Sequence, residues 1–165
     1  MDPLPLHPKL VHLPIALAVL APLLALGVIA AWRTAFLPRR SWILVVVLQA
    51  LLVGSGWAAL STGQDEENTV GRVVERQHVH EHEEAAELFL WAAGGVLLLA
   101  IVPMVLRREG LATAAALLTA AGMLVVVFLV YRTAEAGGAL VYRYGAASAY
   151  ASAVAGGGER EVPPE

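Results

Sequence analysis

Four long stretches of the chain contain no formally charged residue. They run from Leu10 to Trp32, from Trp42 to Leu60, from Leu88 to Leu106 and from Leu111 to Tyr131. A hydrocarbon core about 30 Å thick is crossed by roughly 20 helical residues, and each stretch is about that long. A helix satisfies its own backbone groups within lipid, so the pattern predicts four transmembrane helices. The predicted spans cover residues 10–32, 42–60, 86–106 and 111–132.

The polar segment before the third span is also expected to be helical. From Asp65 it is rich in helix formers and contains no proline. We therefore expect helix over about residues 64–85, capped by Ser61 or Thr62 and continuous with the third span. We expect Gly137-Gly138 to break the fourth helix, and residues 156–165 to form a disordered tail.

These elements predict an all-α protein. Its architecture would be an integral membrane four-helix up-down bundle, with the third helix extended outward beyond the membrane. One transmembrane domain would cover residues 1–155.

Composition supports this interpretation and excludes several functions. Hydrophobic residues make up 58% of the chain and charged residues 15%, which leaves too little polar surface to coat a soluble globule. The absence of cysteine excludes disulfides, thiolate metal sites, iron–sulfur clusters and covalently attached c-type haem. No phosphate-binding loop, dinucleotide fingerprint or nucleophilic triad is visible, so we do not expect an enzyme acting on its own, or a nucleic-acid partner. Ionisable groups are absent from the middle of the spans, which disfavours a transporter or channel.

Charge along the chain predicts the orientation. The two short loops, residues 33–41 and 107–110, contain five arginines and a single acid, Glu109. The positive-inside rule places such loops in the cytoplasm. We therefore predict an inner-membrane protein whose termini and His/Glu-rich segment face outward, into the periplasm.

All five histidines fall on this predicted outer side. His7 and His12 lie at the outer end of the first span, and their spacing of five does not place them on one helix face. His78, His80 and His82 precede the third span, and His78 shares a face with His82 because they are four residues apart. Two helices therefore carry imidazole at similar depth.

One chemistry that this arrangement suggests is a b-type haem. Such a haem needs one imidazole on each axial side, at similar depth on facing helices. His12 paired with His82 meets this requirement, with His78 as a substitute ligand. Trp57 and Trp91 would line the site. Four nearby glycines would allow close approach: Gly54, Gly56, Gly94 and Gly95.

A second chemistry is a divalent metal, zinc or copper. Glu75, His78 and His82 form one helix face with three ligands suited to these ions, and His12 could complete the set. The alternative is that His78 and His80 belong to an ordinary solvated helical stalk, while His7 is an N-terminal cap or interface anchor and His12 an interfacial histidine that donates to a neighbouring helix.

Other features indicate packing rather than chemistry. Ala112, Ala116 and Ala120 form a small-residue stripe on the fourth helix, as helix-packing surfaces in membranes do. Three aromatic residues are expected to anchor the spans at the membrane interface: Trp32, Trp42 and Tyr131.

Three motifs resemble one bacterial membrane protein family, known as domain of unknown function 2231. The opening HPKLVHLPIALAVLAPL (His7–Leu23) is similar to its first motif, and Ser61–Gly63 resembles its end of helix two. Gly137–Gly145 resembles its closing motif, with Tyr144 where the family has histidine. The resemblance implies four helices and an outward-facing site, and no established activity. Its helix count is similar to that of small b-type cytochromes of the two-haem four-helix class.

Three functions remain open at this point. The leading hypothesis is a haem-binding electron-transfer subunit with its site near the outer surface. The others are a structural accessory subunit of a larger membrane complex, or a divalent-metal-binding protein. Besides the lipid bilayer, we expect other membrane subunits or a homo-oligomer as partners.

Overall fold

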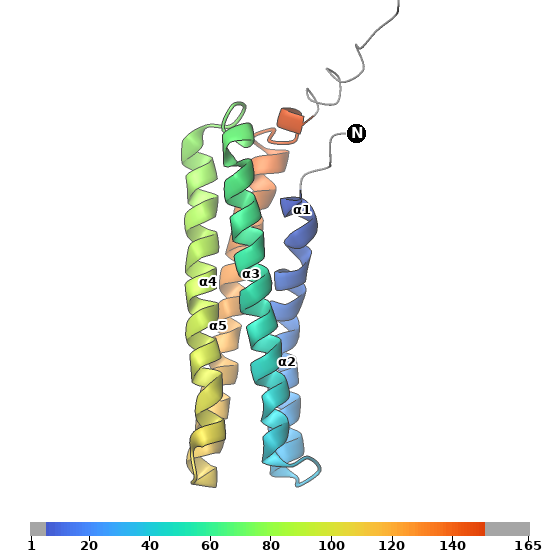
Figure 1. The fold of residues 1–165 in the computed structure, drawn as a ribbon, viewed down its shortest axis with the longest axis vertical. Coiled ribbons are helices and arrows are strands. Elements are labelled where there is room, and N and C mark those ends of the chain that lie inside the picture. Colours follow the sequence, from blue (N-terminus) through green and yellow to red (C-terminus); the bar gives the residue numbers. More distant parts are fainter. Residues whose placement is uncertain (1–5, 151–165) are drawn as a thin grey trace, which may run out of the picture.

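The computed structural model describes residues 6–150, and its helices form a single up-down bundle (Figure 1). The elements are α1 (His7–Leu10), α2 (His12–Arg33), the 3-10 helix η1 (Arg39–Trp42), α3 (Ile43–Val70), α4 (Arg76–Val105) and α5 (Glu109–Tyr142). The expected tail over residues 156–165 lies outside the described residues. Over the described range all regular structure is helical, as predicted.

Each long helix packs against two others. Helix α2 contacts α3 and α5, and α4 contacts the same two helices, so the four form a closed square. In Figure 1, α1, the α3–α4 turn and the end of α5 gather at one end of the bundle, which we call the histidine end because it carries His7 and His82. The opposite end carries the α2–α3 loop with Arg39 and the α4–α5 turn with Arg107, and we call it the arginine end.

Within the described residues, four helical segments are long and apolar enough to cross a membrane. Helices α3, α4 and α5 contain 28, 30 and 34 residues, well beyond the roughly 20 that a bilayer requires. The surplus lies at the histidine end, because the uncharged stretches stop at Leu60 and Tyr131 and begin at Leu88. The third spanning helix extends beyond its apolar stretch at the histidine end, and α3 and α5 extend beside it.

The polar extension is divided differently from the prediction. Residues 61–70 complete α3, a turn follows over residues 71–75, and α4 begins at Arg76. The Thr62 hydroxyl does not cap a new helix, because it donates back to the carbonyls of Ala58 and Ala59 at 3.1 and 3.0 Å. Continuing an existing helix avoids the unfavourable nucleation of a new one, so α3 runs on to Val70.

The expected break at Gly137-Gly138 is also absent from α5, which continues to Tyr142. A glycine inside a helix costs only about 1 kcal/mol relative to alanine, which packing can offset. The chain turns instead at Gly145, whose φ of 72° lies in the left-handed region that glycine tolerates. The Ala146 amide then bonds back to the Leu140 carbonyl at 2.9 Å.

Small side chains let α2 and α5 approach closely. The stripe on α5, Ala112, Ala116 and Ala120, is at most 5% exposed, and it shares one buried cluster with alanines of α2. Those α2 residues are Ala18, Ala21 and Ala25. The predicted packing role of the α5 stripe is confirmed.

Two of the three expected interface anchors lie inside the bundle instead. Trp42 is fully buried, and its indole Nε1 donates to the Ala100 carbonyl at 2.8 Å. Trp32 is also buried, with the Arg39 guanidinium against one face of its ring. Both indoles join helices at the arginine end, whereas Tyr131 is exposed on α5 as an anchor would be.

Candidate functional site

Two imidazole rings meet at the histidine end. His7 is the first residue of α1 and His82 lies in α4, and their ring centroids are 6.2 Å apart with an interplanar angle of 80°. Both side chains are half-buried. The pair therefore joins two helices that are far apart in the sequence.

The ring of His7 is held by a carbonyl of α3. Its Nδ1 lies 2.8 Å from the Ala59 carbonyl oxygen. In an α-helix this carbonyl already accepts from the amide four residues on, which belongs to Gly63, and the Thr62 hydroxyl also donates to it at 3.0 Å, so the imidazole shares the oxygen with these donors. A Cβ on Gly63 would lie 3.1 Å from both Cε1 and Nδ1 of His7. Glycine at this position therefore opens the carbonyl to the imidazole.

The ring of His82 is held in the same way by α5. Its Nδ1 lies 3.1 Å from the Thr133 carbonyl oxygen, and the residue four positions on is Gly137. A Cβ on Gly137 would lie 2.9 Å from His82 Cε1, closer than real Cβ contacts. The two halves of the site are therefore alike. In each, a histidine bonds to a carbonyl of another helix, and a glycine one turn after that carbonyl leaves space for the ring.

These contacts define the tautomer of both rings. A carbonyl oxygen only accepts hydrogen bonds, so each Nδ1 carries the proton and each neutral ring keeps its lone pair on Nε2. His82 lies outside the uncharged stretch that begins at Leu88. Burial, and to a lesser extent the neighbouring His7, lower the pKa of His82, which favours its neutral form. Metal-ligating histidines are oriented by this kind of second hydrogen bond.

A carboxylate of α3 bonds residues near both ends of the described range to this region. Glu66 accepts the backbone N–H of His7 at 3.3 Å and the hydroxyl of Tyr150 at 2.8 Å. Burial and the adjacent Glu66 carboxylate raise the pKa of the Tyr150 phenol, so it stays protonated as a donor. The segment after α5 is thereby held over the histidine end.

The structure does not bring the predicted pair together. His12, the first residue of α2, is exposed, while His7 points inward toward His82. The spacing of five that separates these two histidines explains why they point to different sides. His78 is near His82 on α4, but its ring stacks on Tyr144 at 3.9 Å between centroids.

The predicted metal face is not assembled either. Glu75 is exposed at the N-cap of α4, and His78 Nδ1 lies 3.3 Å from a Glu81 carboxylate oxygen. His80 points outward, with Nε2 3.2 Å from Glu84. Over residues 6–150, no group of three or more His, Cys, Asp or Glu side chains is placed to hold a metal ion.

The residues predicted to line a haem face elsewhere. Trp57 and Trp91 are 66% and 80% exposed on the outside of the bundle. Of the four predicted glycines, Gly56 packs on Phe89, and nothing lies within 4 Å of a Cβ built at the other three: Gly54, Gly94 and Gly95.

Sequence reasoning missed the role of Gly63 and Gly137, the two glycines that contact imidazole. A signal for them exists, since both lie inside motifs that carried the family resemblance. The sequence suggests a helix breaker at Gly137, but in the continuous helix α5 this residue lies one turn after Thr133 and beside the His82 ring.

Comparison with known proteins identifies the family. The family model described as "Predicted membrane protein (DUF2231)" matches residues 3–149. No curated protein and no solved structure matches the chain. The chain therefore belongs to the DUF2231 family of membrane proteins.

Proposed function

We propose that this protein is a membrane-bound redox subunit that holds a b-type haem through His7 and His82 and transfers electrons. One observation carries the proposal. Two imidazoles from different helices lie 6.2 Å apart between centroids, and each is fixed through Nδ1 so that Nε2 bears the lone pair. His7 replaces His12 in the pairing that the sequence suggested.

The separation of the rings suits axial ligation. A metal–nitrogen bond is about 2 Å long and the ring centre lies about 1 Å further on, so two imidazoles on opposite sides of one metal have centroids about 6 Å apart. The observed 6.2 Å agrees with this value. A bound haem would supply reversible one-electron transfer. The Ala59 and Thr133 carbonyls would orient the two ligands and increase their basicity.

The position of the site follows from the charge asymmetry. Five arginines and one acid occupy the loops of the arginine end, which supports a cytoplasmic location for that end in a bacterial inner membrane. The histidine end, and both termini with it, would then face the periplasm. Electrons would be exchanged near the outer surface.

Absorption spectroscopy tests the proposal. The protein is expressed with sufficient haem, purified in detergent and reduced with dithionite. We expect a Soret band and the sharp α and β bands of six-coordinate low-spin haem, which His7→Ala and His82→Ala each abolish. His80→Ala is the matched control, because this exposed histidine of α4 is directed away from the pair. A wild-type protein without a Soret band would refute haem binding.

The same experiment separates the two pairings. If His12→Ala removes the low-spin spectrum and His7→Ala retains it, the ligand is His12 and the proposed pair is wrong. The near-perpendicular rings also predict a strongly anisotropic low-spin EPR signal in the oxidised protein.

A bound zinc or copper ion is the second candidate, favoured by the same two Nε2 lone pairs. Elemental analysis of wild type and His82→Ala tests it, and a metal content that His82→Ala leaves unchanged would exclude the pair as ligands. Stoichiometric co-purification with partner subunits, without chromophore or metal, would instead support an accessory role.

A further inference from the structure

The arginine end carries a concentrated positive charge without compensating acids. Its five arginines face one carboxylate, Glu109. Across residues 6–150 the ion pairs all join histidine to glutamate at the histidine end. Four of these arginines are exposed: Arg33, Arg40, Arg107 and Arg108. Such a cluster beside a membrane favours anionic ligands.

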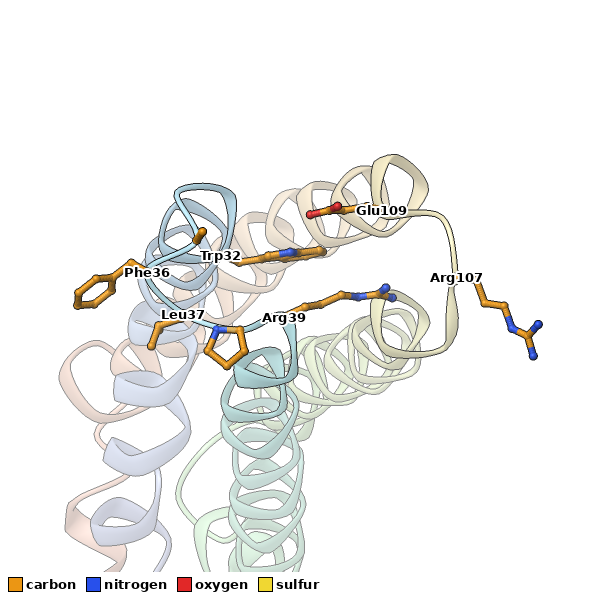
Figure 2. A pocket seen from close by; sticks show the side chains of 8 residues that line it. Trp32, Phe36, Leu37, Arg39, Arg107 and Glu109 are labelled. Carbon is orange, nitrogen blue, oxygen red and sulfur yellow. The ribbon is translucent and has the colours of Figure 1, made fainter.

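Arg39 differs from the other four because its charge is already engaged. Its guanidinium donates to the carbonyls of Pro103 and Leu106 at the end of α4. Figure 2 shows its side chain running beneath the Trp32 ring, 5.6 Å from guanidinium carbon to ring centroid, while Arg107 extends outward from the α4–α5 turn. Arg39 therefore joins α4 to the α2–α3 loop.

Two open hollows lie on either side of η1. The first, of about 600 Å³, lies between the α2–α3 loop and the α4–α5 turn (Figure 2), and the acid Glu109 is part of its wall. The second, of about 520 Å³, is free of acids. It is lined by Arg40, Ser41, Ile43, Leu44 and Met104.

The second hollow combines a cation with an apolar wall at the depth of lipid headgroups. Arg40 lies two residues before the uncharged stretch that starts at Trp42. Ile43, Leu44 and Met104 are 43%, 53% and 42% exposed, on the outer surface of the apolar stretches of α3 and α4. A phosphate at the level of Arg40 would therefore have its acyl chains beside these three residues.

We propose that this hollow binds an anionic phospholipid of the surrounding leaflet. The Arg40 guanidinium holds the headgroup phosphate, and the Ser41 hydroxyl donates to it. Ile43, Leu44 and Met104 contact the glycerol and the first methylenes of the acyl chains. The site lies at the opposite end from the histidine pair, so it is independent of whether haem is bound.

Lipid retention by the full chain tests this site. Wild type in mild detergent is incubated with phosphatidylglycerol or phosphatidylcholine, and bound lipid is counted by native mass spectrometry. We expect selective retention of phosphatidylglycerol, weakened about tenfold by Arg40→Gln, which removes a charge-assisted bidentate contact. Arg33→Gln is the matched control, since it removes the same charge from the same end but lines neither hollow.

A second variant removes the space and leaves the charge. Met104→Trp is expected to fill the hollow and lower retention as Arg40→Gln does, and Leu44→Trp serves if that variant does not fold. Equal losses in Arg33→Gln and Arg40→Gln would overturn the site in favour of diffuse attraction. Full retention in the filled variant, or displacement of the lipid by inorganic phosphate, would overturn it as well.

Discussion

Replacing Gly137 by alanine tests whether glycine is needed at this position for the His82 imidazole to bond the Thr133 carbonyl. The added Cβ would lie 2.9 Å from His82 Cε1, so the ring must move away from the Thr133 carbonyl. Gly138 is the matched control, because a Cβ at that position meets nothing within 4 Å. Both glycines lie in α5, so the two variants share the same change in helix propensity.

The expected magnitudes follow from this difference. Alanine in place of glycine inside a helix contributes about 0.5–1 kcal/mol, and Gly138→Ala should stabilise the protein by that amount. In Gly137→Ala the same gain is opposed by about 1 kcal/mol for the lost Nδ1 hydrogen bond and about 1–3 kcal/mol for overpacking. We expect the two variants to differ by about 2 kcal/mol or more. At roughly 2–4 °C per kcal/mol, their melting temperatures should differ by at least about 4 °C.

Thermal unfolding in detergent measures the difference, and nitrogen NMR of labelled imidazoles reports the tautomer. In wild type and Gly138→Ala, the His82 ring should show a protonated Nδ1, whereas in Gly137→Ala the two tautomers should mix. The reasoning fails if Gly137→Ala is as stable as Gly138→Ala and its His82 signals are those of wild type.

Three further predictions concern pH and buried polar groups. Because the pKa of His82 is lowered in the folded state below its usual 6.5, the unfolded chain binds more protons on acidification, so stability should be full above pH 6.5 and fall as the pH is lowered through and below that value. Denaturation across this range should show a weaker pH dependence in His82→Gln than in wild type or His80→Gln, and an unchanged slope would contradict the assignment. Gln49 is fully buried, and its Nε2 donates to the Ala93 carbonyl at 3.0 Å, but over residues 6–150 its Oε1 has no hydrogen-bond partner. Because relief of the buried Oε1 offsets the loss of the Nε2 bond, Gln49→Leu should leave thermal stability unchanged or raise it by up to about 1 kcal/mol, and a large loss would show that Oε1 is satisfied as well. Trp42→Phe removes the indole bond to Ala100 and part of a filled volume, so thermal unfolding should report a loss of about 1–3 kcal/mol, and a neutral result would contradict the burial of this ring.

The sequence predicts the spans well because lipid imposes a length and a composition on every crossing helix. Charge-free stretches of about 20 residues were enough to place all four of them. It predicts the helix ends less well, because polar helix formers continue a helix as readily as they start one, as residues 61–70 of α3 do.

The sequence suggested His12 as the partner of His82, whereas the structure places His7 beside His82, since depth along the first span does not tell which ring points inward. The inward position of the His7 ring depends on Gly63, which is distant from His7 in the sequence and leaves space for the ring beside the Ala59 carbonyl. The tryptophans show the same limit. Trp42 looks like an interface anchor by position, but its indole donates to Ala100 of a different helix.

In both halves of the site, the histidine and the carbonyl that it bonds have nearly the same separation in the sequence. His7 and the carbonyl it bonds are 52 residues apart, and His82 and its carbonyl are 51 residues apart. The pair α1–α3 therefore orients His7, and the pair α4–α5 orients His82, each through its own hydrogen bond. The separation of the two rings depends instead on how these two pairs of helices pack against each other, along the α2–α5 and α3–α4 contacts. Because close approach of α2 and α5 relies on alanine stripes, a bulky residue at Ala116 should change the 6.2 Å ring separation from a position far from either histidine, while leaving both Nδ1 hydrogen bonds intact.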